Sequence, residues 1–247
     1  MGFFEHLEEL RGVLVKSLIA FVICAVAIGY FVREFFDVLQ WPLHQARTQY
    51  PEFVLDLGTH KVFEVFTMLI QMCVMGGLAL ASPAILFFIG QFVAPALTER
   101  ETKAVLPMCI SALFLFLLGA SFGFFLLMPA SIEAAVRLHD WFGLTARWTV
   151  GDYYSTMMWL VFGVGASFEF PLVVVMLVWL GLLSTAFLRK YRRHAIVAIF
   201  VIAAVVTPTP DPFIQTIFAL PLYALYEIAI IVSARIEKKR EGKARFG

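Results

Sequence analysis

Apolar residues along this chain of 247 residues come in long blocks, with polar residues gathered between the blocks. Predominantly apolar stretches cover residues 12–32, 62–93, 104–128, 153–180, 195–206 and 213–234. A helix needs about 20 apolar residues to cross a bilayer, because each residue advances it by about 1.5 Å. The pattern therefore predicts an all-α integral membrane protein, a single domain over residues 1–247 built as a bundle of six transmembrane helices.

The predicted spans differ in length and continuity. The stretch 62–93 is long and is interrupted at Ser82-Pro83, and the stretch 153–180 contains Pro171. Only about twelve residues separate Ala195 from the proline-rich segment 207–212, which predicts a tight reversal because proline cannot donate a backbone hydrogen bond. We therefore expect the fifth span, and the sixth that follows the reversal, to be short, with a locally thinned bilayer.

Lysine and arginine are distributed unequally between the connecting segments. Five of the 19 lie in the two longer loops between spans, namely Arg33, Arg47, Lys61, Arg137 and Arg147. The other fourteen lie on the opposite side, including the basic tail 235–247. Because basic loops stay in the cytoplasm, the pattern predicts that both chain ends are cytoplasmic. The two longer loops should form short helices that cap the outer end of the bundle.

Composition excludes several classes of function. Hydrophobic residues make up 61% of the chain and charged residues 15%, and the net charge of +1 gives no field that would attract nucleic acid. The cysteines Cys24, Cys73 and Cys109 lie within apolar stretches without metal-site spacing. The five histidines lie in loops or at span ends, away from any helix-borne nucleophile. We expect no enzymatic activity, no cofactor and no metal site.

Acidic residues mark two candidate sites on the cytoplasmic side. Residues 1–11 form an amphipathic helical segment in which Glu5, Glu8 and Glu9 occupy the polar side. Carboxylates beside an anionic leaflet are unfavourable, which suggests that they bind an incoming basic group, although a solvated face also explains them. Glu99 and Glu101 open the third span, where capping of the helix N-terminus is an equally good explanation.

Two more candidates lie within or between spans. Glu169 is the one carboxylate that we single out inside a span, and it lies two residues before Pro171. A carboxylate there costs on the order of 2.5–3.5 kcal/mol, so we interpret it as functional, the alternative being a protonated acid bonded to loosened backbone. At the outer reversal, Thr207, Asp211 and Gln215 could bind a neighbouring or partner helix, and simple packing within the bundle explains them equally well.

Four segments taken together resemble a known family. They are HLEELR (6–11), FVAPALTERE (92–101), SFEFP (167–171) and TPTPDPFIQ followed by ALPLYALYE. In this order they are similar to TatC, the multi-span receptor subunit of the twin-arginine protein translocase. The resemblance extends over essentially the whole chain. It implies that Glu9, Arg11 and Glu101 bind the twin-arginine signal peptides of folded cargo proteins. It also matches Glu169 and Asp211 to the family's intramembrane glutamate and outer-turn aspartate.

The resemblance further implies a location and partners. It places the protein in the cytoplasmic (inner) membrane of a prokaryote, working with single-span TatA and TatB subunits and other copies of itself, with export driven by the proton-motive force. Two alternatives from other classes are a proton-coupled small-solute transporter using Glu169 and an intramembrane hydrolase. The absence of an internal repeat disfavours the first, and the absence of a catalytic base disfavours the second.

Overall fold

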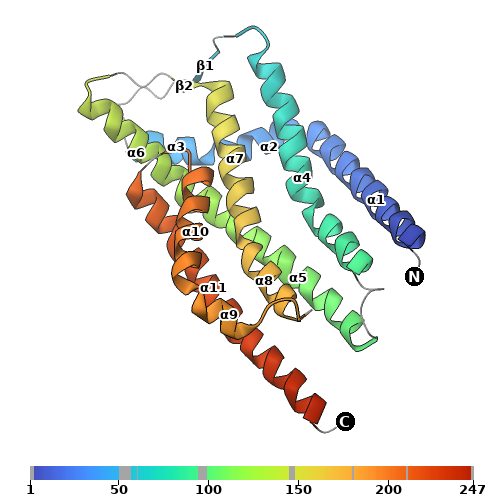
Figure 1. Cartoon of the computed structure of the whole chain (residues 1–247). Helices are drawn as coiled ribbons and strands as arrows, with labels where there is room; N and C mark the ends of the chain where they lie inside the picture. The colour runs from blue at the N-terminus through green and yellow to red at the C-terminus, as the bar shows by residue number, and fades with distance from the viewer. Residues whose placement is uncertain are drawn as a thin grey trace.

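A computed structural model describes residues 3–49, 57–59, 61–93, 99–144, 148–179, 181–209 and 211–245. Helices account for nearly all of these residues (Figure 1). The principal helices are α1 (Phe3–Tyr30), α4 (Glu64–Val93), α5 (Glu99–Phe122), α7 (Val150–Phe168), α8 (Phe170–Trp179), α10 (Arg192–Val206) and α11 (Pro212–Arg245). Shorter elements are α2 (Val32–Leu39), α3 (Trp41–Gln49), β1 (Leu57–Gly58), the π-helix η2 (Gly123–Leu127), α6 (Met128–Trp141), β2 (Trp148–Thr149) and α9 (Thr185–Lys190).

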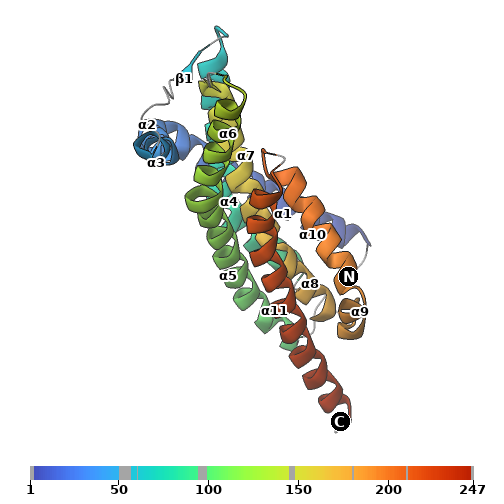
Figure 2. The same ribbon diagram turned by 90° about the vertical axis from the view of Figure 1, so that its left-hand side faces the viewer.

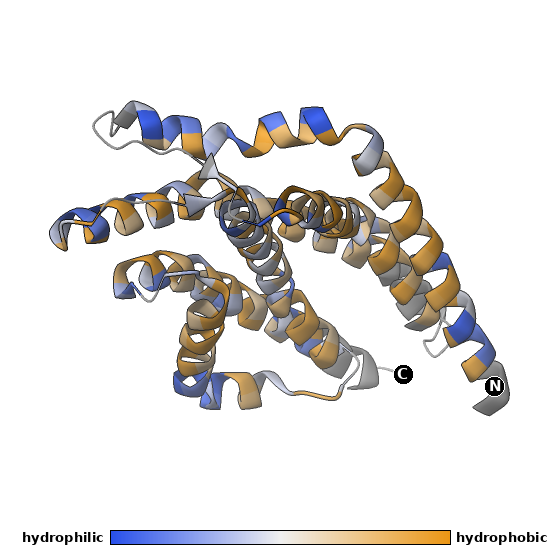
Figure 3. Ribbon diagram, turned by 90° about the horizontal axis from the view of Figure 1, so that it is seen from above, coloured by the Kyte–Doolittle hydropathy of each residue, from blue (hydrophilic) through white to orange (hydrophobic). Residues whose placement is uncertain are grey.

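The helical spans follow the predicted order. Five helical stretches of the described chain are long and apolar enough to cross a membrane: Leu7–Tyr30, Glu64–Ile89, Leu106–Trp141, Val150–Trp179 and Pro212–Lys238. The sixth crossing element is α10, whose 15 residues confirm that the fifth span is short. Hydrophobic residues predominate along the helices, and hydrophilic residues lie mostly near the helix ends (Figure 3). The described part of the chain is therefore an elongated helical bundle (Figure 2).

Three expectations about helix boundaries need correction. The sixth span is not short, because α11 runs for 34 residues. Its last part is rich in Glu, Lys and Arg, which are good helix formers and let the helix continue beyond its apolar part. The N-terminal amphipathic segment is not a separate element, because residues 3–11 are the first turns of the continuous helix α1.

The third correction concerns helix α4, which was expected to be interrupted at Ser82-Pro83 but continues unbroken through Pro83. Proline at this position leaves the carbonyl of Ala79 without its usual N–H partner. The hydroxyl of Ser82 donates to that carbonyl at 2.8 Å and replaces the missing bond. The serine beside the proline therefore preserves the helix that the proline was expected to interrupt.

Helix α7 lies at the centre of the bundle (Figure 1). Its side chains Tyr154, Met157, Leu160 and Val164 are completely or almost completely buried. It packs directly against α5, because a Cβ atom on Gly119 would lie 2.7 Å from the Phe168 ring. Small residues at this contact let the two backbones approach closely, as is common between membrane helices.

Short elements cap one end of the bundle, and they come from the two longer loops, as predicted. Helices α2, α3 and α6 come from the two longer loops, and β1 pairs in parallel with β2 through Leu57–Trp148 and Gly58–Thr149. Below this pair, Glu64 Oε1 accepts a hydrogen bond from the Gly151 N–H at 2.9 Å, which ties α4 to the start of α7. Both chain ends lie toward the opposite end of the bundle in Figure 1.

Candidate functional site

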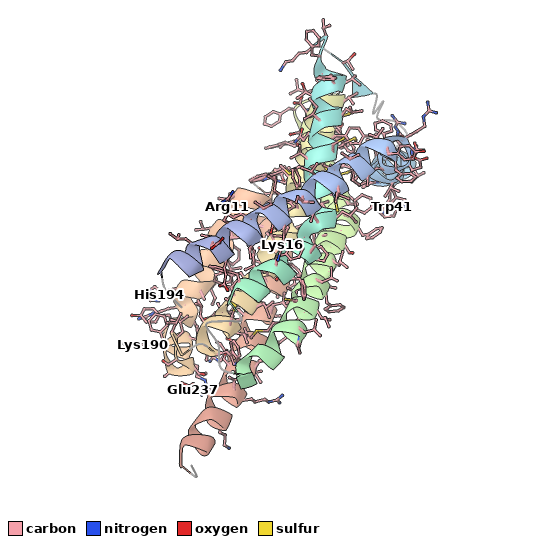
Figure 4. The ribbon with its side chains drawn as sticks, turned by 90° about the vertical axis from the view of Figure 1, so that its right-hand side faces the viewer. Arg11, Lys16, Trp41, Lys190, His194 and Glu237 are labelled. Atoms are coloured by element: carbon pink, nitrogen blue, oxygen red, sulfur yellow. The ribbon has the colours of Figure 1, made fainter. Side chains whose placement is uncertain are left out.

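The predicted recognition residues of the N-terminus lie on the first three turns of α1. Glu9 is half-buried, whereas Glu8 and Arg11 are exposed. In a continuous helix, residues two positions apart differ by about 200° around the axis, so Glu9 and Arg11 face nearly opposite sides. Glu8, three residues before Arg11, lies on the same side of α1 as Arg11. Arg11 and Lys16 lie along α1 in Figure 4.

Glu101 lies in the first turn of α5, which begins at Glu99 as expected. Its side chain is outside the part of the chain whose side chains the structure describes, as are residues 94–98 as a whole. The starts of α1 and α5 lie near the same end of the bundle in Figure 1, together with the end of α4. The arrangement of the helices thus brings the N-terminal acids and the 99–101 segment to one end.

Glu169 occupies the junction between α7 and α8. The helix breaks there, as expected from Pro171: the Glu169 N–H bonds the Ala166 carbonyl at 3.1 Å instead of the carbonyl four residues back. Ser167 donates its hydroxyl back to Gly163 at 2.6 Å. Glu169 Oε1 is buried and has no hydrogen-bond partner among the described residues. An acid held in this way can still form a hydrogen bond with a polar group from outside the chain.

An apolar groove lies between α1, α2, α4, α5 and α7. Its volume is about 410 Å³. The side chains that line it include Met75, Ala79, Phe116, Ala120, Met158 and Phe162. Phe116 also touches α7 one turn before Glu169, since a Cβ atom on Gly165 would lie 2.9 Å from its ring.

Of the three residues predicted at the reversal between α10 and α11, Thr207 and Asp211 bond the backbone of their own chain through their side chains. Thr207 is buried and donates its hydroxyl to the Ala203 carbonyl at 2.8 Å. Asp211 Oδ1 accepts from the Phe213 N–H at 2.8 Å, so Asp211 acts as the N-cap of α11 with Pro212 in the first helical position. Gln215 is half-buried, one turn into α11, and its backbone N–H bonds the Asp211 carbonyl at 3.0 Å.

A second acid inside a span was missed by the sequence analysis. Glu227 lies within the candidate span of α11, so Glu169 is not alone. Its Oε2 is 2.8 Å from Arg192 Nη2, at the start of α10, and its Oε1 accepts from the Tyr223 hydroxyl at 2.9 Å. The arginine was visible in the sequence, but it lies 35 positions away, and only the antiparallel packing of α10 and α11 brings the two together.

Comparisons with known proteins cover nearly the entire chain. The family model of the Sec-independent protein translocase protein (TatC) matches residues 5–221. The Sec-independent protein translocase protein TatC of Azotobacter chroococcum mcd 1 is 32% identical, with 100% of this chain and 94% of the relative covered. That of Aquifex aeolicus (strain VF5) is 34% identical, with 96% of each chain covered.

A solved structure agrees with these relatives. The crystal structure of the twin-arginine translocase receptor TatC in DDM superposes with a TM-score of 0.79 at 34% identity, over 92% of this chain and 99% of that one. The chain belongs to the TatC family. It is therefore a component of a Sec-independent protein translocase in the inner membrane and not an enzyme. The small-solute transporter and hydrolase alternatives are set aside on the same evidence.

Proposed function

We propose that this TatC protein is the receptor for twin-arginine signal peptides and the assembly core of the translocase. The observation that supports this most directly is its similarity, at 34% identity, to a solved protein described as the twin-arginine translocase receptor. Glu9 and Glu101 would bind the two arginines. A guanidinium fork meets a carboxylate through two parallel hydrogen bonds, which a lysine cannot reproduce. Arg11, on another side of α1, would bind carbonyl groups of the peptide backbone.

Binding of a synthetic signal peptide to the purified protein tests this function. The twin-arginine peptide should bind more tightly than its twin-lysine version, and Glu9→Ala and Glu101→Ala should each weaken binding about tenfold to a hundredfold, the value of a charge-assisted contact of about 1.5–3 kcal/mol. Glu133→Ala is the matched control, because that acid lies on α6 at the capped end. Unchanged affinity in both variants, or equal affinity for the two peptides, would refute the recognition site.

The orientation of the protein is part of the same proposal. We propose that both chain ends face the cytoplasm, on the basis of the unequal distribution of Lys and Arg. Cysteine substitutions at positions 140, 102 and 243 in intact cells should react with an impermeant reagent only at 140. Labelling at position 243 from outside the cell would show that the C-terminus is not cytoplasmic and would contradict the proposed orientation.

Assembly with the single-span TatA- and TatB-type subunits is assigned to the membrane-embedded residues. Glu169 would form a hydrogen bond with a polar side chain of a partner helix, because its buried Oε1 has no partner among the described residues. Gln215 would provide a second contact near the outer turn. Thr207 would help to shape that surface through its backbone, because its hydroxyl already bonds Ala203. Energy for export would come from the proton-motive force.

A further inference from the structure

A basic and aromatic surface at the turn between α9 and α10 has no role in the proposed function. We call it the basic turn and define it as Phe187, Arg189, Lys190, Tyr191, Arg193 and His194, all of them exposed. The Phe187 and Tyr191 rings lie 4.4 Å apart, and Lys190 Nζ lies 5.9 Å from the centre of the Tyr191 ring. Lys190 and His194 lie along the same edge of the bundle in Figure 4.

Helix α11 holds the backbone of this turn in place at three points. The Tyr226 hydroxyl donates to the Leu188 carbonyl at 3.0 Å, and Glu237 Oε2 accepts from the Thr185 N–H at 3.1 Å. The third point is the ion pair of Arg192 with Glu227. The exposed basic side chains therefore project from a fixed backbone, which reduces the entropy lost when they bind a ligand.

The charges of the basic turn are not neutralised within the described part of the protein. Arg192 forms an ion pair with Glu227. No described acid lies within ion-pair distance of Arg189, Lys190 or Arg193. Three cations within five residues repel one another unless an anion lies between them. The turn is thus complementary to a negatively charged group.

The length of α10 sets the depth of this turn in the membrane. Its 15 residues extend about 22 Å, whereas the hydrocarbon core of a bilayer is about 30 Å thick. A helix that is too short draws the headgroups inward around its ends. The neighbouring side chains Leu182 and Val197 are 69% and 64% exposed and apolar, as expected for a surface in contact with lipid tails. In Figure 2, α9 and α10 lie at the edge of the bundle.

We propose that the basic turn binds the phosphate of an anionic lipid headgroup. Arg189 and Arg193 would contact phosphate oxygens, since the guanidinium fork suits this geometry. Lys190 would add a point charge, and Phe187 and Tyr191 would lie at the level of the headgroups, where aromatic residues are favoured. The ligand is a lipid and not an acidic protein segment because exposed apolar residues flank the turn on both sides.

Native mass spectrometry of the delipidated full-length protein tests the site. Phosphatidylglycerol and phosphatidylcholine are titrated separately into the wild type and into Arg189→Gln/Lys190→Gln. The matched control is Arg235→Gln/Lys238→Gln, which removes the same charge from exposed positions on α11. At about 1 kcal/mol for each basic residue, the turn variant should bind phosphatidylglycerol about thirtyfold more weakly and the control almost normally. Arg189→Lys/Lys190→Arg should keep most of the binding, and an unchanged melting temperature shows that each variant is folded.

Several results would overturn the proposal. The first is that the wild type binds phosphatidylglycerol and phosphatidylcholine equally well. The second is that the turn variant and the control lose the same amount of phosphatidylglycerol affinity, or that neither loses any. Inorganic phosphate and a polyglutamate peptide serve as competitors. Displacement of the lipid by millimolar phosphate would assign the turn to a free anion, and displacement by micromolar peptide would assign it to an acidic protein partner. Failure of both to displace the lipid supports a lipid site.

Discussion

Two acids within the membrane spans have opposite surroundings. Glu169 lies at a helix break, where Pro171 interrupts the backbone ladder, and its Oε1 is buried without a partner among the described residues. Glu227 lies in the unbroken helix α11, and both of its oxygens are bonded, one to Arg192 and the other to the Tyr223 hydroxyl. The same side chain therefore occurs once with one buried oxygen left without a partner and once with both oxygens bonded.

The difference indicates distinct roles. An intramembrane acid whose oxygens are hydrogen-bonded within the chain holds parts of that chain together in the folded state. A carboxylate oxygen that is buried without a partner carries a desolvation cost, which a hydrogen bond from a partner helix would offset. Glu227 is accordingly a structural contact between α10 and α11, whereas we propose that Glu169 serves in assembly. The following experiments test that division.

The largest effect is expected at Glu169. Photo-cross-linking from position 170, next to it, to the single-span partner subunits should fall at least tenfold in Glu169→Ala. Glu169→Gln should retain much of it, because an amide still offers a donor and an acceptor. Both variants should bind the signal peptide almost normally. If Glu169→Ala abolished peptide binding and left the cross-links intact, the proposed division between partner contact at Glu169 and peptide binding at Glu9 and Glu101 would be wrong.

At Glu227 the expected change is in stability. Glu227→Ala leaves Arg192 unpaired, but the pair is partly exposed, with 28% and 46% of the two side chains accessible, so the loss should be about 1–2 kcal/mol. A double-mutant cycle with Arg192→Ala, followed by unfolding in mixed micelles, measures the coupling. The cross-links at position 170 should be unchanged. A coupling energy near zero would show that the pair does not join α10 to α11.

Asp211 extends the comparison to a third acid, the second whose carboxylate is bonded within the chain. Asp211→Ala removes the N-cap of α11 and should cost about 1 kcal/mol, whereas Asp211→Asn should cost much less because asparagine is an equally good cap. The unfolding free energies of the two variants distinguish the contributions. A large export defect in Asp211→Asn without loss of stability would point to a role beyond capping.

The smallest effect is expected for the phenol that bonds Glu227. Tyr223→Phe removes one of two bonds to a carboxylate that keeps its arginine, and the two side chains lie one turn apart on the same helix, where such a pair contributes about 0.2–0.5 kcal/mol. The melting temperature in detergent should fall slightly, less than in Glu227→Ala. A loss as large as that of Glu227→Ala would make the hydroxyl, and not the ion pair, the main contact.

Individual prolines show how far the sequence could predict the fold. Pro171 was expected to interrupt its helix, and the helix breaks at Glu169. Pro83 was expected to do the same, but Ser82 donates to the freed Ala79 carbonyl and the helix continues. The end of α11 was misplaced for another reason, since hydropathy marks where a helix leaves the apolar region and not where the helix itself ends.

Candidate site residues could be predicted where the signal was local in the sequence, and they were missed where the partner lay far along the chain. Glu169 could be recognised because the cost of an acid in a span and the effect of Pro171 are both local properties. Glu227 could not be assigned, because its partner Arg192 is 35 positions away. Asp211 was correctly placed in the reversal between the last two helices, but its bond to the Phe213 N–H, which makes it a cap, needed the backbone geometry.

The sequence by itself determined that this protein is a bundle of membrane helices with a short fifth span, because the length and apolarity of a segment decide whether it can cross a bilayer. It also carried the ordered motifs of the TatC family. Only the tertiary structure decided which polar groups are satisfied. A hydrogen bond or an ion pair needs two groups within about 3 Å, and for Glu227 with Arg192, and for Glu64 with Gly151, helix packing alone brings them together.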